Sequence, residues 1–189
     1  MRSSCIAFPN ALLMGMVLQG IFFVQALNVF AAQEHAAPVE AVQASVPGAT
    51  VVGSGVLFYA FWDIYEATLF APGGVWDANQ PHALSIEYFR ALDGKAIADR
   101  SVQEIRQQGF TDEVTLAAWH AQMKAIFPDV KKGTVLTAVY IPDAHTTFYK
   151  GAETIGVIKD DAFGKAFFGI WLAEKTSEPK LRRALLGLQ

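Results

Sequence analysis

Apolar and polar residues alternate along several segments of the chain, and this period of two predicts β-strands. The expected strands lie over residues 51–70, 83–90, 134–141, 146–149 and 154–158. The first segment, rich in β-branched and aromatic residues, is long enough for one strand or for two strands paired near Trp62 and Asp63. Residues 150–153 alone separate the last two segments, which predicts a β-hairpin.

A helical period of apolar residues marks the middle of the chain. Ser101 and Glu104 have the spacing of a capping box, which predicts a helix that Gly109 ends. Thr111 is expected to cap the next helix, and Pro128 is expected to end it. The apolar stripe of this second helix consists of Leu116, Trp119, Met123, Ile126 and Phe127.

Two more helices are predicted at the C-terminal end. The first begins with Asp160 and Asp161, whose charge favours a helix N-terminus, and its apolar positions are Phe163, Phe167, Ile170 and Trp171. The second begins near Ser177 with Pro179 in its first turn, meets Gly187 at its end, and has on one face Leu181, Leu185 and Leu188. This order of strands and helices predicts an α+β domain with helices grouped on one face of an antiparallel sheet.

The strongest apolar segment stands apart from this pattern, near the N-terminus. Residues 11–32 carry no charge, Arg2 precedes them, and Val29–Ala31 offers the small residues that a signal peptidase reads. We interpret residues 1–31 as a signal peptide with cleavage near Ala31, which predicts a periplasmic or secreted protein. The alternative is an uncleaved leader that anchors the chain in a membrane.

Residues 32–50 are rich in Ala, Val, Pro and Glu, and this composition predicts a flexible linker or arm. The globular domain is therefore expected over residues 51–189. A membrane is expected as a partner only through an uncleaved leader.

Composition argues against several classes of function. The only cysteine, Cys5, lies in the predicted leader, so the mature domain would have no disulfide. A formal net charge of −3 without a basic cluster argues against a nucleic-acid partner. The histidines are isolated from one another in the sequence, so no metal site is expected. Gly53 and Gly55 open like a dinucleotide-binding motif, but Phe58 stands where its third glycine belongs, and no cofactor is expected.

Aromatic and basic side chains supply candidates for a binding site. Phe58, Trp62 and Trp119 are candidate walls for a hydrophobic ligand, although such aromatic residues are more often part of a core. Arg90 and Arg100 are candidate polar anchors, because a guanidinium can hold a carboxylate or an enolate. The alternative for Arg90 is an ion pair with a neighbouring carboxylate.

The C-terminal block resembles a known family. Residues 167–172 (Phe-Phe-Gly-Ile-Trp-Leu) and residues 177–187 are similar to the C-terminal signature of bacterial chalcone isomerase-like proteins. Further pieces that fall in the family's order are Gly53–Leu57, Tyr65–Phe70, Leu84–Arg90, Phe127–Val130 and Phe148–Tyr149. The resemblance implies the chalcone isomerase fold, an open-faced β-sandwich in which a layer of helices covers a large antiparallel sheet.

The resemblance does not extend to the catalytic pattern of the plant enzymes. Those enzymes carry an arginine two residues after an early Gly-x-Gly, and the matching residue here is Leu57. They also place a tyrosine and an asparagine in the helical region, and neither residue type occurs between positions 91 and 127. Because an aliphatic side chain cannot stabilise a developing anion, true chalcone isomerase activity is not expected.

Three functions remain as hypotheses. The first is an exported domain that binds a small hydrophobic or fatty-acid-like ligand, because non-catalytic relatives in the superfamily include fatty-acid binders. The second is an isomerase or intramolecular lyase on an unknown substrate, with Tyr65, Arg90 or Tyr149 as acid–base or electrostatic groups. The third is a periplasmic assembly or interaction protein with a broad apolar surface. The oligomeric state is left open.

Overall fold

The structure, a computed structural model, describes residues 42–188. The signal peptide predicted for residues 1–31 lies outside the described residues, as does the first part of the arm predicted for residues 32–50. Within the described part, no helix has both the length and the apolar character needed to cross a bilayer.

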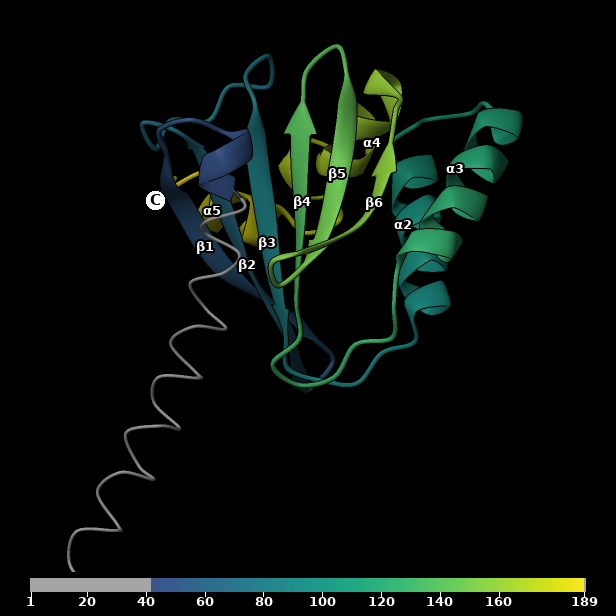
Figure 1. Ribbon diagram of the computed structural model, residues 1–189. Helices are drawn as coiled ribbons and strands as arrows, with labels where there is room; N and C mark the ends of the chain where they lie inside the picture. The colour runs from purple at the N-terminus through teal and green to yellow at the C-terminus, as the bar shows by residue number, and fades with distance from the viewer. Residues whose placement is uncertain (1–41, 189) are drawn as a thin grey trace, which may run out of the picture. The chain divides into compact units, whose positions relative to one another are not determined.

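Six strands form one antiparallel sheet in which each strand pairs with the next one along the chain (Figure 1). The strands are β1 (Ala49–Tyr59), β2 (Trp62–Pro72), β3 (His82–Tyr88), β4 (Val135–Ile141), β5 (His145–Lys150) and β6 (Glu153–Ile158). Loops join neighbouring strands except between β3 and β4, where two helices intervene. The segment predicted as one strand or two is therefore two paired strands, β1 and β2, and the hairpin of β5 and β6 is confirmed.

Four helices, α2 to α5, lie on one side of the sheet, whereas the short helix at residues 42–45 lies on the other side, where Val42 and Val46 are buried. Helices α2 (Gly94–Gln107) and α3 (Glu113–Ile126) connect β3 to β4, whereas α4 (Asp161–Leu172) and α5 (Pro179–Leu185) follow β6. Behind the sheet in Figure 1, α4 packs against β4 and β5, and α5 packs against β1 and β2. Helix α2 has its main contacts with α3 and α4. The predicted α+β architecture, with helices covering an antiparallel sheet, is confirmed.

The two helices between β3 and β4 leave and rejoin the sheet at one place. Leu92 and Val130 form an isolated antiparallel bridge, with backbone N–H···O distances of 3.1 Å and 3.0 Å. Strands β3 and β4 pair directly with each other beyond this bridge. The α2–α3 pair is therefore an insertion into a single β-hairpin.

Alternation along the strands divides the buried side chains between two clusters. The side of the sheet that faces the helices buries, among others, Ala67, Leu84, Ile86, Ala138 and Phe148. The smaller cluster on the opposite side consists of Val42, Val46, Ala49, Ala83 and Val139. Because Val42 and Val46 are fully buried, packing begins before Val51, the predicted start of the domain.

Aromatic rings join the helical layer to the sheet. Phe163 on α4 is fully buried, and its ring centroid lies 5.4 Å from that of Phe167, 5.6 Å from Trp119 and 6.2 Å from Phe148. Asp160 caps α4 and also accepts a hydrogen bond from Trp119 Nε1 at 2.8 Å, which ties α3 to the start of α4. The structure confirms the predicted buried face of α4, which consists of Phe163, Phe167, Ile170 and Trp171.

Helix α2 begins well before the position predicted from Ser101. Its N-cap is Asp93, whose carboxylate accepts a hydrogen bond from a first-turn amide at 2.9 Å. Asp129 accepts a second bond, from the amide of Gly94 at 2.9 Å, so this start depends on a residue distant in sequence. Ser101 lies inside the helix, where its hydroxyl donates to the carbonyl of Ile97. The capping box predicted at Ser101 is therefore wrong.

Two other helix ends differ in detail from the prediction. Asp112, and not Thr111, caps α3, because its carboxylate accepts hydrogen bonds from two first-turn amides, both at 3.1 Å. Leu188 lies beyond the end of α5 and is exposed, so only Leu181 and Leu185 form the buried face of that helix. The end of α3 before Pro128 is as predicted.

Helix α5 comes close to β1 because two residues of the strand lack side chains. A Cβ atom at Gly53 would lie 2.2 Å from the carbonyl oxygen of Ala184, and one at Gly55 would lie 2.9 Å from the side chain of Leu181. Gly53 and Gly55, which match the first two glycines of a dinucleotide-binding motif, therefore have a packing role here.

Asp161 at the start of α4 makes stability depend on acidity. Its carboxylate pairs with Lys165 at 2.6 Å and accepts a hydrogen bond from the hydroxyl of Tyr140 at 2.7 Å. These partners, Lys165 first, lower the pKa of Asp161 from 3.8 to about 2. Since the folded pKa lies below the unfolded one, this stabilisation is present above about pH 4 and is lost as the pH falls towards about 2.

We therefore expect Asp161→Asn to flatten the fall in Tm between about pH 4 and pH 2. Thermal unfolding followed by circular dichroism across this range measures the effect. Glu174→Gln, at an exposed position, is the matched control and should keep the parent profile. A parent-like slope in Asp161→Asn would contradict the assignment.

Candidate functional site

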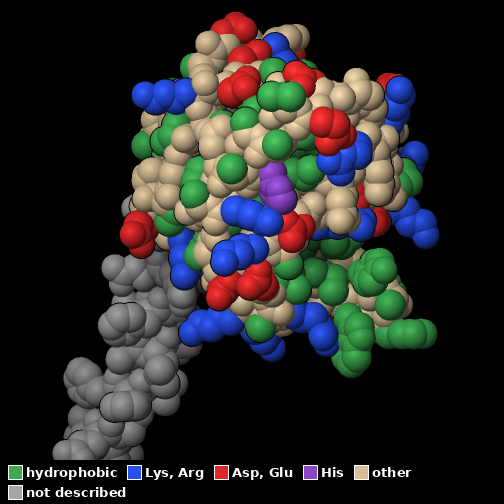
Figure 2. All heavy atoms as spheres, turned by 90° about the vertical axis from the view of Figure 1, so that its right-hand side faces the viewer, with side chains coloured by type: hydrophobic (Ala, Val, Ile, Leu, Met, Phe, Trp, Pro, Cys, Tyr) green, Lys and Arg blue, Asp and Glu red, His purple; other side chains and the backbone are tan. Residues whose placement is uncertain are grey.

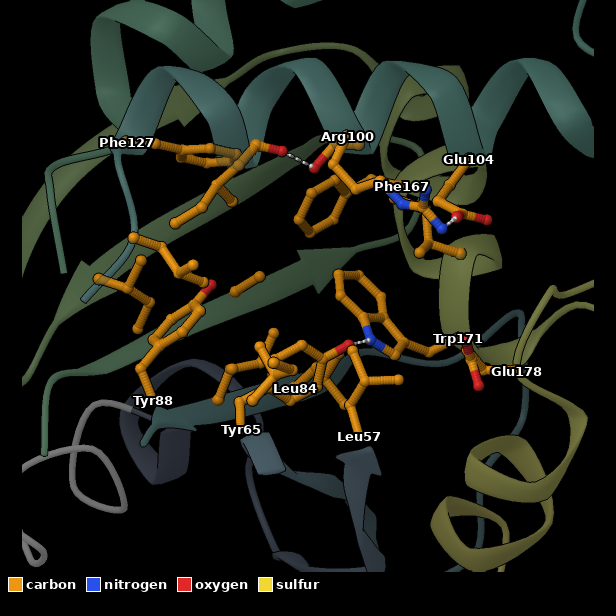
Figure 3. Close-up of a pocket in the computed structure, with 18 of the residues that line it drawn as sticks. Leu57, Tyr65, Leu84, Tyr88, Arg100, Glu104, Phe127, Phe167, Trp171 and Glu178 are labelled. Atoms are coloured by element: carbon orange, nitrogen blue, oxygen red, sulfur yellow. Dashed lines mark hydrogen bonds and ion pairs between the residues drawn. The ribbon is translucent and has the colours of Figure 1, made fainter. Parts of the chain in front are cut away.

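A cavity of about 290 Å³ lies between the helix-facing side of the sheet and helices α2 and α4 (Figure 3). Helix α2 packs mainly against α3 and α4, and the space left between it and the strands is the cavity. The volume is at the small end of the range found for pockets that hold organic ligands. The fold therefore leaves room for one small molecule.

Most of the cavity wall is apolar. The central strands contribute Leu84, Ile86, Leu136, Ala138 and Phe148. The helical layer and its connections contribute Leu92, Ile97, Phe127, Phe167, Ile170 and Trp171. Ala138 is the smallest side chain that the strands supply to this wall. Such a surface favours a hydrocarbon group over a strongly hydrated one.

Two tyrosine side chains bring hydroxyl groups to this apolar wall. Tyr65 on β2 is paired with Tyr88 on β3, and their ring centroids lie 5.9 Å apart. The hydroxyl of Tyr65 accepts a hydrogen bond from Trp171 Nε1 at 2.8 Å. The hydroxyl of Tyr88 has no hydrogen-bond partner among the described residues and points into the cavity in Figure 3, although the residue is only 4% exposed.

Burial is the main cause that raises the pKa of both hydroxyl groups, of Tyr65 and of Tyr88, far above the usual range. Both groups therefore stay protonated at physiological pH. Each can donate a hydrogen bond to an oxygen atom of a ligand.

Charged residues gather where the cavity opens to solvent. Arg100 on α2 forms an ion pair with Glu104 one turn later. The Glu104 carboxylate, with a side chain only 6% exposed, also accepts a hydrogen bond from Ser177 Oγ at 2.8 Å. Glu178 adds a second carboxylate to the wall. Among the described residues, Arg100 thus supplies the one guanidinium on this wall, and it is already paired and accompanied by two carboxylates.

The β1–β2 hairpin forms another side of the opening. The strand register shifts between Leu57 and Phe58 and leaves Ile64 without a cross-strand partner. The carbonyl of Ile64 instead accepts a hydrogen bond from the amide of Phe89 at 2.9 Å. Leu57 and Ile64 both lie on the cavity wall beside this bulge. An aliphatic residue, Leu57, thus lines the cavity at the position that the resemblance compares with an arginine.

Of the five residues predicted to contact a ligand, Arg100 lies on the cavity wall. Phe58 and Trp62 are exposed at the end of the β1–β2 hairpin, and Arg90 stacks on Trp62 with its guanidinium carbon 4.0 Å from the ring centroid. Arg90 therefore has an aromatic partner in place of the neighbouring carboxylate that the sequence offered as the alternative. Trp119 is buried within the helical layer. A ligand contact by any of the five stays a prediction.

The three candidate acid–base residues lie in different places. Tyr65 is on the cavity wall, and Arg90 is at the hairpin. Tyr149 is on the opposite side of the sheet, where its hydroxyl oxygen lies 3.4 Å from that of Ser45. The structure does not bring these three groups into one cleft, so at most one of the three alternatives could act in the cavity described above. Their catalytic roles stay predictions.

Three chemically important wall residues were not proposed as site residues from the sequence. Tyr88 is the last residue of β3 and follows Leu84 and Ile86 on the same apolar face. A hydroxyl group on that face is the sequence signal that could have identified Tyr88 as a site residue. Glu104 was interpreted as part of a capping box, because the start of α2 was placed too late. Trp171 was interpreted as helical cover, although a buried indole N–H needs a partner and finds it in Tyr65.

The wall chemistry suits an organic ligand. Nowhere in residues 42–188 do three or more His, Cys, Asp or Glu side chains converge in a way that could hold a metal ion. The cavity wall is mostly hydrocarbon, and its polar groups are two phenolic hydroxyl groups, one guanidinium–carboxylate pair, the carboxylate of Glu178 and the hydroxyl groups of Ser101, Thr137 and Ser177.

A single antiparallel sheet, a helical layer on one side and a mostly apolar cavity between them define an open-faced α+β protein with a ligand-sized interior space. The chalcone isomerase-like family matches residues 39–187, and the chain belongs to this family. The resemblance stated from the C-terminal block is thereby confirmed.

Known relatives extend this result. An uncharacterized protein of Haemophilus influenzae is 30% identical over 137 residues, which cover 72% of this chain and 67% of that protein. Among solved structures, the fatty-acid binding protein AtFAP1 of Arabidopsis thaliana matches with a TM-score of 0.59, covering 74% of this chain and 87% of the other. At 10% sequence identity, this likeness shows a shared fold.

Proposed function

We propose that this protein binds a small hydrophobic ligand, such as a fatty acid or a related lipid, in the cavity between its sheet and its helices. The observation that carries the proposal is the cavity, which has an apolar wall and few polar groups at defined positions. Burial of a hydrocarbon chain there is favoured by about 25 cal/mol per Å² of apolar surface. The fatty-acid binding stated for AtFAP1, which shares the fold, supports the same class of ligand.

The polar groups favour one orientation of the ligand. At the opening, the guanidinium of Arg100 is paired with Glu104, and Glu178 lies nearby, so an anionic head group would meet two carboxylates. Deeper in the cavity, Tyr65 and Tyr88 offer neutral O–H donors. We place the oxygen-bearing end of the ligand at these two hydroxyl groups and its hydrocarbon chain against the apolar wall.

This placement favours an uncharged head group. A carboxylate buried beside two neutral hydroxyl groups would lack a counter-charge, which is costly in an apolar interior. We therefore expect a fatty alcohol, or an acid in its protonated form, to bind better than the carboxylate of equal chain length.

The test of the proposed function is a chain-length series. Octanoic, decanoic, dodecanoic and hexadecanoic acids and the matching alcohols are added to the purified protein, and the melting temperature is recorded. A ligand that binds only the folded state raises Tm, and the small cavity predicts a maximum at an intermediate chain length. The proposal fails if no compound shifts Tm and native mass spectrometry finds no lipid on the purified protein.

Tyr88→Phe is expected to weaken binding of decanol by about fivefold, because one net hydrogen bond contributes about 1 kcal/mol. The substitution removes a hydroxyl that has no partner among the described residues, so the fold should be unaffected. Displacement of a fluorescent fatty-acid probe measures the affinity. Tyr149→Phe, on the opposite side of the sheet, is the matched control and should bind as the parent does. Parent-like affinity in Tyr88→Phe would refute the placement of the head group.

A further inference from the structure

We propose that the end of the β1–β2 hairpin docks onto the surface of membranes that contain anionic lipids. We call residues 58–62 the hairpin tip. Ten large hydrophobic side chains are exposed in residues 42–188, and the four aromatic ones among them all belong to this tip. They are Phe58, Tyr59, Phe61 and Trp62, with exposed fractions from 55% to 87%. Figure 2 shows a hydrophobic projection at its lower right, at the end of the sheet where Figure 1 places this hairpin.

The tip is held in an ordered shape although it is exposed. Tyr59 and Trp62 pair across a two-residue turn, in which Ala60 has the left-handed φ of 56°. Arg90 stacks on the Trp62 ring at 4.0 Å and joins the tip to the segment after β3. Tyr59 and Trp62 therefore lie on one face of the hairpin and Phe58 lies on the other, so exposed aromatic rings surround the tip.

Basic side chains lie at the same end of the sheet. Besides Arg90, the exposed ones are Lys95, Lys131 and Lys132. Backbone hydrogen bonds hold their segments beside the hairpin, from Phe89 N to the carbonyl of Ile64 (2.9 Å) and from Gly133 N to the carbonyl of Tyr88 (2.8 Å). Figure 2 shows Lys and Arg side chains along the lower edge of the molecule, next to the hydrophobic projection.

Carboxylates also lie at this end, among them Asp63, Asp93 and Asp129, with the pair of Glu66 and Glu87 one position further along β2 and β3. Asp93 and Asp129 accept hydrogen bonds from backbone amides at the start of α2. These carboxylates keep their negative charge, so the charge around the tip is mixed, and the exposed Lys95, Lys131 and Lys132 are the groups that an anionic lipid surface would attract. An apolar tip with these lysines beside it complements an anionic lipid surface, where aromatic rings settle at the level of the head groups.

The size and shape of the tip favour a membrane over a protein partner. Four partly exposed aromatic side chains offer on the order of 500 Å² in total. A stable protein–protein interface needs about 800 Å² on each partner and a complementary surface. A narrow projecting hairpin instead fits insertion between lipid head groups, where binding grows with the buried apolar area.

The tip adjoins the opening of the cavity. Leu57 on β1 and Ile64 on β2, the strand residues next to the tip, are cavity-wall residues. Docking would bring the opening close to the lipid surface and allow ligand exchange there, and this last step rests on the proposed function. The inference also differs from the sequence-based expectation that only an uncleaved leader would bring the protein to a membrane.

Trp62 provides the test, because its fluorescence reports on the tip whatever the state of the leader. The full chain is mixed with vesicles of phosphatidylglycerol and phosphatidylethanolamine that carry brominated acyl chains. We expect quenching of the tryptophan emission by the bromine, and loss of this quenching in Trp62→Phe. Phe58→Ser combined with Phe61→Ser should reduce the quenching at a given lipid concentration by at least about tenfold.

Matched controls distinguish binding through the tip from nonspecific adsorption of the protein to vesicles. Val75→Ser combined with Val114→Ser removes exposed apolar groups elsewhere and should leave the quenching unchanged. Lys131→Gln combined with Lys132→Gln should weaken binding to anionic vesicles, as should added salt. The inference is overturned if the vesicles do not quench Trp62, or if light scattering shows that the tip mediates dimerisation without lipid.

Docking and ligand binding can fail separately. Quenching is measured without ligand, and probe displacement is measured without vesicles. If docking is as proposed, the Phe58→Ser, Phe61→Ser protein should bind decanol normally but exchange it with vesicles more slowly. Normal quenching without any ligand binding would leave docking intact and refute the proposed function. Normal ligand binding without quenching would refute docking alone.

Discussion

Ala138→Phe is expected to abolish ligand binding while the domain stays folded. Ala138 lies on β4 between Leu84 and Phe148, and all three line the cavity. A phenyl group there would occupy space now open to a ligand. If about ten ligand atoms lose their place, at roughly 0.3 kcal/mol per atom, affinity falls by at least about a hundredfold. Displacement of a fluorescent fatty-acid probe measures this loss.

The control keeps the position and changes only the size. Ala138→Ser leaves the cavity open and should retain binding to within a few fold. Circular dichroism and thermal unfolding establish that Ala138→Phe is folded, since a side chain that fills existing space need not strain its surroundings. Full binding by a folded Ala138→Phe protein would place the ligand somewhere other than this cavity.

Phe163→Ala is expected to destabilise the domain strongly. The side chain is fully buried, and its ring contacts Trp119, Phe148 and Phe167. Removal of a buried phenyl group costs about 3–5 kcal/mol in the free energy of unfolding, because both apolar contact and packing are lost. Typical domains have about 5–15 kcal/mol in total, so this variant should unfold at a much lower urea concentration.

Val114→Ala provides the comparison, because Val114 is 82% exposed on α3 and should change the free energy of unfolding by less than about 0.5 kcal/mol. Urea titrations of the parent and the two variants give the difference directly. A cost below about 1 kcal/mol for Phe163→Ala would mean that the aromatic cluster does not hold the helices to the sheet.

Local signals in the sequence were enough to predict the parts of the fold that local interactions determine. Alternation located the strands, and the short connection at residues 150–153 located the hairpin of β5 and β6. The start of α4 was predicted because Asp160 caps it from the adjacent position. The start of α2 was missed because it also depends on Asp129, across the whole α2–α3 insertion.

The candidate site was harder to predict because it depends on strand register. Tyr65 and Tyr149 are both strand tyrosines, yet pairing sends one to the cavity and the other to the opposite side of the sheet. Phe58 and Trp62 are residue types that are usually buried in a core. They are exposed here because the hairpin extends past α5, which covers β1 at Gly53 and Gly55. Neither the length of the helical layer nor the position of the bulge at Ile64 can be inferred from composition.

The bridge between Leu92 and Val130 closes the α2–α3 insertion, and α2 forms one wall of the cavity. The α2–α3 segment departs from and returns to neighbouring points of a hairpin whose own pairing is complete without it. A change in the length or sequence of this segment would reshape one wall of the cavity without disturbing the register of the sheet. If the proposed ligand binding holds, sequence changes in this segment, made together with its contacts to α4 and to Ser177, would alter which ligand fits while the pairing of the strands is kept.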